Sequence, residues 1–203
     1  MARTLTVAVF YYTQTGQALA IARSLCAPLE AAGCRVVKRE IRPVTAYPYP
    51  WSSEAFFQVF PESRLGIACA IEPVDLSGAV AEADLVLVVG QSWYLSLSTP
   101  LHAFFQSPEV RTYLHGRPVV FVNGCRNMWV MTQYETRRYL RGSTPVVSVS
   151  KPSSGPWIHE SSVPTGAGER RGRSCCWFIT GSLPPGCDTG CGAYRPIRCR
   201  RER

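Results

Sequence analysis

Two patterns of apolar residues alternate along the first two-thirds of the chain. Four stretches resemble strands, because nearly continuous apolar or β-branched residues are typical of a parallel sheet that is buried on both faces. They cover residues 5–12, 35–41, 83–90 and 118–122. Apolar residues at helical spacing predict helices over residues 18–32, 101–106 and roughly 128–141. This alternation predicts an α/β fold with a doubly wound parallel sheet.

An unusual aromatic segment, residues 43–63, interrupts this alternation. Three prolines precede Trp51, and Phe56, Phe57 and Phe60 then recur at helical spacing. The pattern predicts an irregular entry followed by a short aromatic helix. Two roles are open for these rings: they form core against one face of the sheet, or they roof a pocket that admits a hydrophobic substrate.

The pattern stops near residue 142. Residues 143–203 are rich in Gly, Pro, Ser, Arg and Cys, and only Val146–Val149 resembles a strand. We therefore expect a domain over residues 1–142 and a tail over residues 143–203 that is disordered and unlike the family of the domain. The fifth strand of the sheet is expected to be incomplete or missing.

The net charge of +8 changes this picture little. Residues 143–203 contain 9 Lys and Arg against 4 Asp and Glu, so most of the excess lies in the tail and indicates no specific nucleic-acid partner. No apolar run is long enough to cross a bilayer, and the first residues lack the cleavage site of a secretory signal. We expect a cytoplasmic protein. The tail cysteines form no C-x-x-C pair, so we expect no metal site.

The loop after the first predicted strand has the composition of a phosphate site. It consists of Thr13, Gln14, Thr15, Gly16 and Gln17, and it opens the first helix. Unpaired N–H groups and the helix dipole favour an anion at that position, the hydroxyls add donors, and glycine permits close approach. The alternative is an ordinary polar turn that caps the helix.

A second loop, residues 91–99, follows the strand over residues 83–90. Trp93 and Tyr94 are large planar side chains that suit stacking on a flat heterocycle, and Ser92 could reach its polar edge. The alternative interpretation is that both rings simply cover the end of the sheet.

The third loop follows the strand over residues 118–122 and contains Gly124, Cys125, Arg126 and Asn127. Because the carboxyl ends of parallel strands share one edge, all three loops are expected to meet there, where open α/β sheets bind ligands. Backbone N–H groups near Gly124 could bond a ring carbonyl, and Arg126 could stabilise negative charge on a reduced ring. Helix capping by Asn127 and a surface role for Arg126 are the alternatives.

Four segments together carry a family resemblance: YYTQTGQ, YPYPW…FFQVFPES, SWYLSLSTP and NGCRNMWVMTQ. The first is similar to the phosphate loop of flavodoxins, and the third resembles the second loop of flavodoxin-like NAD(P)H oxidoreductases. The combination, over roughly residues 5–141, resembles a bacterial flavodoxin-like group often named dialkylresorcinol-condensing enzyme. The resemblance implies a three-layer flavodoxin-like sandwich with strand order 2-1-3-4-5, and FMN as the cofactor.

Three functional hypotheses follow. The first is an FMN-binding protein that transfers electrons or hydride, as a flavin-dependent NAD(P)H oxidoreductase does, with a small hydrophobic substrate or a redox partner. The second is a non-redox accessory or condensing enzyme in dialkylresorcinol or aryl-polyene lipid biosynthesis, with Cys125 as the candidate nucleophile. The alternative for Cys125 is a buried, packed thiol, and the family name would then reflect an association with the pathway. The third is an inactive, truncated remnant. The sequence gives neither the substrate, the electron donor nor the oligomeric state.

Overall fold

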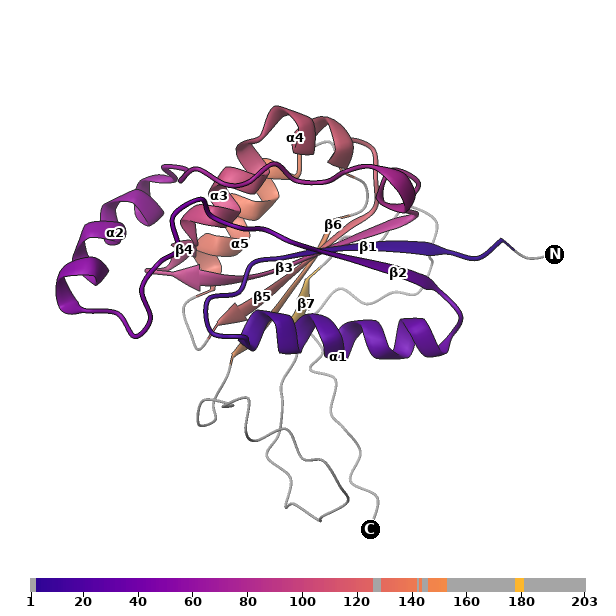
Figure 1. The fold of residues 1–203 in the computed structure, drawn as a ribbon, viewed down its shortest axis with the longest axis horizontal. Coiled ribbons are helices and arrows are strands. Elements are labelled where there is room, and N and C mark those ends of the chain that lie inside the picture. The colour runs from indigo at the N-terminus through magenta and orange to yellow at the C-terminus, as the bar shows by residue number, and fades with distance from the viewer. Residues whose placement is uncertain (1–2, 126–128, 142, 144–145, 153–177, 181–203) are drawn as a thin grey trace, which may run out of the picture.

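The computed structural model describes residues 3–125, 129–141, 143, 146–152 and 178–180. These residues form three layers (Figure 1). A twisted, mainly parallel sheet is the middle layer. Helix α1 covers one face of it, and α2, α3, α4 and α5 lie on the other side.

The predicted elements follow one another in the predicted order, and further short elements lie between and after them. The strands are β1 Thr6–Tyr11, β2 Arg35–Glu40, β3 Leu85–Trp93, β4 Ser96–Leu97, β5 Val119–Cys125, β6 Val146–Pro152 and β7 Phe178–Thr180. The helices are α1 Gln17–Ala31, α2 Ser53–Leu65, the short 3₁₀ turn η1 Gly78–Val80, α3 Thr99–Gln106, α4 Pro108–Leu114 and α5 Val130–Tyr139.

The strand order of the sheet is β2-β1-β3-β5-β6-β7, with the short β4 paired to the end of β3. The pairs β1–β2, β1–β3, β3–β5 and β5–β6 are parallel, whereas β4 and β7 run antiparallel to their neighbours. The predicted α/β fold is confirmed. The predicted strand order 2-1-3-4 is also confirmed, because the short β4 lies outside the main order and β5 is therefore the fourth main strand.

The fifth main strand differs from expectation. The sequence led us to expect it to be incomplete or missing, but β6 pairs with β5 over seven residues, from Val119↔Val146 to Cys125↔Pro152. Ser148, Ser150 and Lys151 alternate with the valines of β6, and this diluted the apolar pattern. Apart from β6, β7 and residue 143, the predicted tail lies outside the described residues.

The two faces of the sheet have separate cores. On one face, Phe10, Val88 and Phe121 pack against α3, whose Leu101 and Phe104 are fully buried. A Cβ on Gly90 would lie 2.1 Å from Leu101 Cδ1, so α3 can approach β3 this closely only because residue 90 is glycine.

The core on the opposite face of the sheet is smaller. Val7, Val9 and Val89 pack against the small inward residues of α1, Ala18 and Ala22. No helix of the described residues is both long and apolar enough to cross a membrane.

The aromatic segment forms α2 between β2 and β3. Ser52 caps the helix by accepting a hydrogen bond from Ala55 N (3.1 Å). The buried face of α2 contains Val59 and Ser63, whereas its three phenylalanines are 39–69% exposed. The interpretation of these rings as core therefore fails for the three helical phenylalanines. It holds in part for Trp51, which precedes α2 and packs against the core.

Candidate functional site

Three loops meet at the carboxyl edge of the sheet, as the parallel register requires. Tyr11 at the end of β1 pairs with Val89 of β3, and Gln91 pairs with Gly124 of β5. The Tyr12 N–H also donates to Val89 O (3.1 Å), which extends the pairing into the first loop. The loop after β1 and the last residues of β5 therefore flank the end of β3, where α/β sheets place ligands.

The first loop leaves the N-terminus of α1 open. Gly16 occupies the cap position with φ of 81°, in the left-handed region that favours glycine. No side chain among the described residues caps the helix, and its first turn contains no acidic residue. The first N–H groups of α1, starting at Gln17, therefore keep their donor capacity and the positive end of the helix dipole.

Thr13 holds a hydroxyl donor that the other described residues leave unused. Its Oγ1 atom is buried yet has no hydrogen-bond partner among the described residues. An unsatisfied buried hydroxyl is costly, and such groups are usually found where a ligand or water completes the bonding. In contrast, Gln14 is engaged, because its Nε2 donates to Pro48 O (3.0 Å). Thr15 is half-buried in the same loop.

Ser92 belongs to a hydrogen-bond network at the end of β3. Asn123 Nδ2 donates to Ser92 Oγ (2.8 Å), and the hydroxyls of Ser92 and Thr132 share a hydrogen bond of 2.7 Å. Thr132 Oγ1 lies 3.3 Å from Leu95 O, to which it donates. This network joins β3, β5 and α5, so the structural role of Ser92 is to hold the ends of the two strands together.

Trp93 lies in the hydrophobic core. Only 8% of its surface is exposed, and its ring makes near-perpendicular contacts with Tyr12, Tyr47 and Trp51 at centroid distances of 5.0–5.8 Å. The structure thus favours the interpretation in which Trp93 covers the end of the sheet.

Tyr94 turns the chain from β3 into β4. Its φ is 49° and that of Leu95 is 74°. The Tyr94 hydroxyl donates to Phe56 O (2.7 Å), and its ring contacts Phe56 and Phe60. Tyr94 is half-buried and fastens α2 to the end of the sheet.

The third loop is described as far as Cys125, and Arg126 and Asn127 lie outside the described residues. A Cβ on Gly124 would lie 3.0 Å from Ile21 Cδ1 and 3.4 Å from Gly90 O, so α1 and β3 both approach this glycine closely. Burial raises the pKa of the Cys125 thiol to about 11. The thiol is therefore protonated near neutral pH, where it is a weak nucleophile.

A buried network behind the site was not predicted as such. His102 is 1% exposed and lies on α3; its Nε2 donates to Ser63 O (3.1 Å), and its Nδ1 accepts from the Tyr139 hydroxyl (2.9 Å). Gln106 Nε2 also donates to the Tyr139 hydroxyl (2.8 Å). These partners satisfy a neutral imidazole, and burial lowers the pKa of His102.

Glu135 completes this network from α5. Its Oε2 accepts from Leu97 N (2.9 Å) and lies 3.9 Å from His102 Nε2, and burial raises the pKa of the carboxyl. The sequence contained one signal for His102, namely a polar side chain inside the otherwise apolar helix α3, and none for Glu135, because α5 is polar along most of its length. Their partners lie 37–39 positions apart, which no local pattern shows.

Among the residues that the structure describes, no group of three or more His, Cys, Asp or Glu side chains could hold a metal ion.

The chain was compared with known families, curated proteins and solved structures. No family model and no curated protein matches it. Solved structures do match. A flavoprotein from Lactobacillus acidophilus, determined in complex with FMN, aligns with a TM-score of 0.57 at 13% identity, over 73% of this chain and 93% of that protein. The fold is flavodoxin-like. A protein from Bacteroides uniformis that is described as a flavoprotein aligns with a TM-score of 0.56 at 16% identity, over 72% of this chain and 88% of its own.

Proposed function

We propose that this chain binds FMN and that Thr13–Gln17 holds its phosphate. The buried, unpartnered Thr13 Oγ1 is the observation that carries the proposal. A phosphate oxygen would accept from this hydroxyl and from the first N–H groups of α1. Gly16, in its left-handed conformation, lets the backbone approach the anion.

The second and third loops would contact the flavin ring. Ser92 lies near the end of β3 and Tyr94 follows that strand, while half-buried Gly124 and Cys125 end β5 at the same edge of the sheet. Arg126 and Asn127 come next in the sequence and belong to the same proposal. Trp93 would support the site indirectly, because its buried ring packs against Tyr12 and Tyr47 and holds them in place. When bound, FMN supplies the redox chemistry, and the chain supplies position, a dry surface and hydrogen bonds.

The solved structures support the choice of FMN over other phosphate ligands. The flavoprotein from Lactobacillus acidophilus was determined in complex with FMN, and it aligns with this chain over 93% of its own length. The position of the site also suits the proposal, because open α/β sheets bind ligands at the carboxyl edge, where the N-terminus of α1 is open.

We further propose electron or hydride transfer, with an oxidoreductase role in the cytoplasm. The resemblance to flavodoxin-like NAD(P)H oxidoreductases supports this choice. The condensing alternative requires an activated thiol, and the raised pKa of Cys125 disfavours it. A pathway link to dialkylresorcinol biosynthesis rests on the sequence resemblance alone.

Titration of the full chain with FMN and with riboflavin tests the phosphate site. The two ligands share the ring and differ in the phosphate. We expect FMN to bind at least tenfold more tightly, measured by quenching of flavin fluorescence, because riboflavin cannot use Thr13 or the helix N-terminus. Equal affinities would contradict the assignment of the loop. Loss of the oxidised flavin absorbance when NADH or NADPH is added without oxygen would test the redox role separately.

A further inference from the structure

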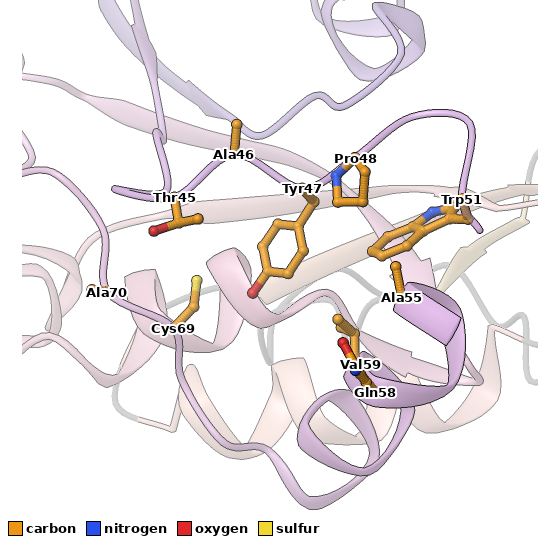
Figure 2. A pocket seen from close by; sticks show the side chains of 10 residues that line it. All are labelled: Thr45, Ala46, Tyr47, Pro48, Trp51, Ala55, Gln58, Val59, Cys69 and Ala70. Atoms are coloured by element: carbon orange, nitrogen blue, oxygen red, sulfur yellow. The ribbon is translucent and has the colours of Figure 1, made fainter. Parts of the chain in front are cut away.

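A pocket lies beside the FMN loop, outside the three loops described above. It is half-open, has a volume of about 310 Å³, and lies between the segment that enters α2, the inner face of α2 and the chain that returns from it. Figure 2 shows the Tyr47 and Trp51 rings as one wall, with Ala55 and Val59 of α2 facing them and Cys69 on the far side. We call it the aromatic pocket.

The walls of the aromatic pocket are fixed in place without a ligand. The Tyr47 hydroxyl shares a hydrogen bond of 2.7 Å with Thr99 Oγ1, and the rings of Tyr47 and Trp51 both pack edge-on against buried Trp93. The bond from Gln14 to Pro48 O holds the outer rim. A preorganised site loses little entropy when a ligand binds, so such a pocket can bind without rearrangement.

The lining selects against charge. All ten side chains that line the pocket are uncharged. Burial raises the pKa of Tyr47 to about 12, so its hydroxyl also stays neutral near pH 7. A charged ligand would lose hydration here without gaining an ion pair from the walls.

The shape selects for a flat ring. Tyr47 and Trp51 present aromatic surfaces whose centroids lie 5.8 Å apart, and Pro48, Ala55 and Val59 add compact apolar surface. The volume is at the lower end of the range for small-molecule sites. Aromatic walls favour planar π-systems through offset or edge contacts.

We propose that the aromatic pocket binds a neutral, planar aromatic molecule of one or two rings. This second ligand is distinct from FMN, and the proposal holds whether or not the Thr13–Gln17 loop binds a phosphate. Because Gln14 joins that loop to the rim at Pro48, the two sites are direct neighbours. The pocket is therefore placed to hold a substrate beside a cofactor.

Calorimetric titration of the full chain with 2-naphthol, in the absence of flavin, tests the proposal. We expect saturable 1:1 binding, and at least tenfold weaker binding of two matched probes. One is 2-decalol, the saturated and non-planar counterpart, and the other is 2-naphthoate, which has the same rings with a negative charge. No saturable binding of 2-naphthol, or equal binding of either counterpart, would overturn the proposal.

Substitutions locate the site. Ala55→Leu on α2 and Cys69→Leu on the returning chain each fill the pocket from a different wall, and each should weaken 2-naphthol binding at least tenfold. Ala20→Leu makes the same change at an exposed position of α1 and should leave binding unchanged. Thermal melting identifies any variant that fails to fold. In that case the variant on the other wall of the pocket provides the test. Binding that survives in a folded pocket variant would place the ligand elsewhere. FMN titration of the same variants reports on the proposed function separately.

Discussion

Thr13 offers the sharpest test at the scale of single residues. Thr13→Val keeps the shape of the side chain and removes the hydroxyl, which has no hydrogen-bond partner in the part of the chain that the structure describes. A hydrogen bond to a charged group contributes about 1.5–3 kcal/mol, so we expect FMN to bind roughly tenfold or more weakly. The free energy of unfolding without flavin should stay level or rise, because no protein hydrogen bond is lost. Fluorescence titration and urea unfolding measure the two effects.

Thr4→Val is the matched control for this change, since Thr4 is exposed and remote in sequence from the loop. It should alter neither FMN affinity nor stability. If Thr13→Val destabilises the flavin-free protein strongly and leaves FMN affinity unchanged, the hydroxyl is structural and the phosphate assignment fails.

His102 predicts how stability depends on pH. Burial lowers its pKa below the ordinary value of 6.5, so the unfolded chain takes up a proton that the folded chain refuses. The stabilisation is therefore complete above about pH 6.5 and is lost as the pH falls toward the folded pKa. Glu135, 3.9 Å away, has a raised pKa and acts in the opposite sense, because it gains its proton more readily when folded.

His102→Gln separates these two contributions. The amide can still donate to Ser63 O but cannot titrate. Urea unfolding at several pH values between about 7.5 and 5.5, around the ordinary pKa of histidine, should show falling stability in the wild type and a smaller fall in the variant. Parallel pH profiles would mean that His102 is not the group responsible.

At the scale of elements, the turn from β3 to β4 is strained. Tyr94 and Leu95 both have positive φ, at 49° and 74°, where two-residue hairpins usually have Asn-Gly. Leu95→Gly should stabilise the protein by about 1 kcal/mol, and in a domain of this size that raises Tm by roughly 2–4 °C. Leu95→Ala removes the same exposed side chain but keeps the strain, so it should bring no gain. Calorimetric melting curves decide, and equal shifts for both variants would exclude backbone strain as the cause.

The elements with a uniform environment could be predicted from the sequence. The strands β1, β3 and β5 are buried on both faces, so their apolar runs are nearly continuous. Helix α4 was not predicted, because only Val110, Tyr113 and Leu114 of its seven residues are buried. The short strand β4 depends on the turn at Tyr94 rather than on any periodicity.

The candidate site likewise contains one part that the sequence could predict and one that it could not. The position of the Thr13–Gln17 loop follows from local order, a strand followed by a helix, so the sequence was enough to place it at the sheet edge. The burial of Trp93 depends on Tyr47 and Trp51, which belong to a different segment and pack against its ring. Such long-range packing leaves no trace in the residues next to Trp93.

At the scale of the whole molecule, the boundary of the domain is a prediction that digestion can test. The composition of residues 143–203 predicts a disordered tail, yet β6 pairs with β5 up to Pro152. We therefore expect a nonspecific protease to leave a stable fragment that extends at least to Pro152, measured by mass spectrometry. A fragment that ends near residue 142 would show that β6 adds little, and a chain that resists cleavage throughout would contradict the predicted tail.

The central claim concerns the whole site at the carboxyl edge of the sheet. Loop, helix N-terminus and neighbouring strand ends are proposed to act together on one cofactor. The most direct measurement is the absorbance and fluorescence of the purified full-length chain titrated with FMN. The account predicts saturable 1:1 binding with quenched flavin fluorescence and a yellow protein that retains its colour through gel filtration. A chain that stays colourless and leaves FMN fluorescence unchanged would contradict it.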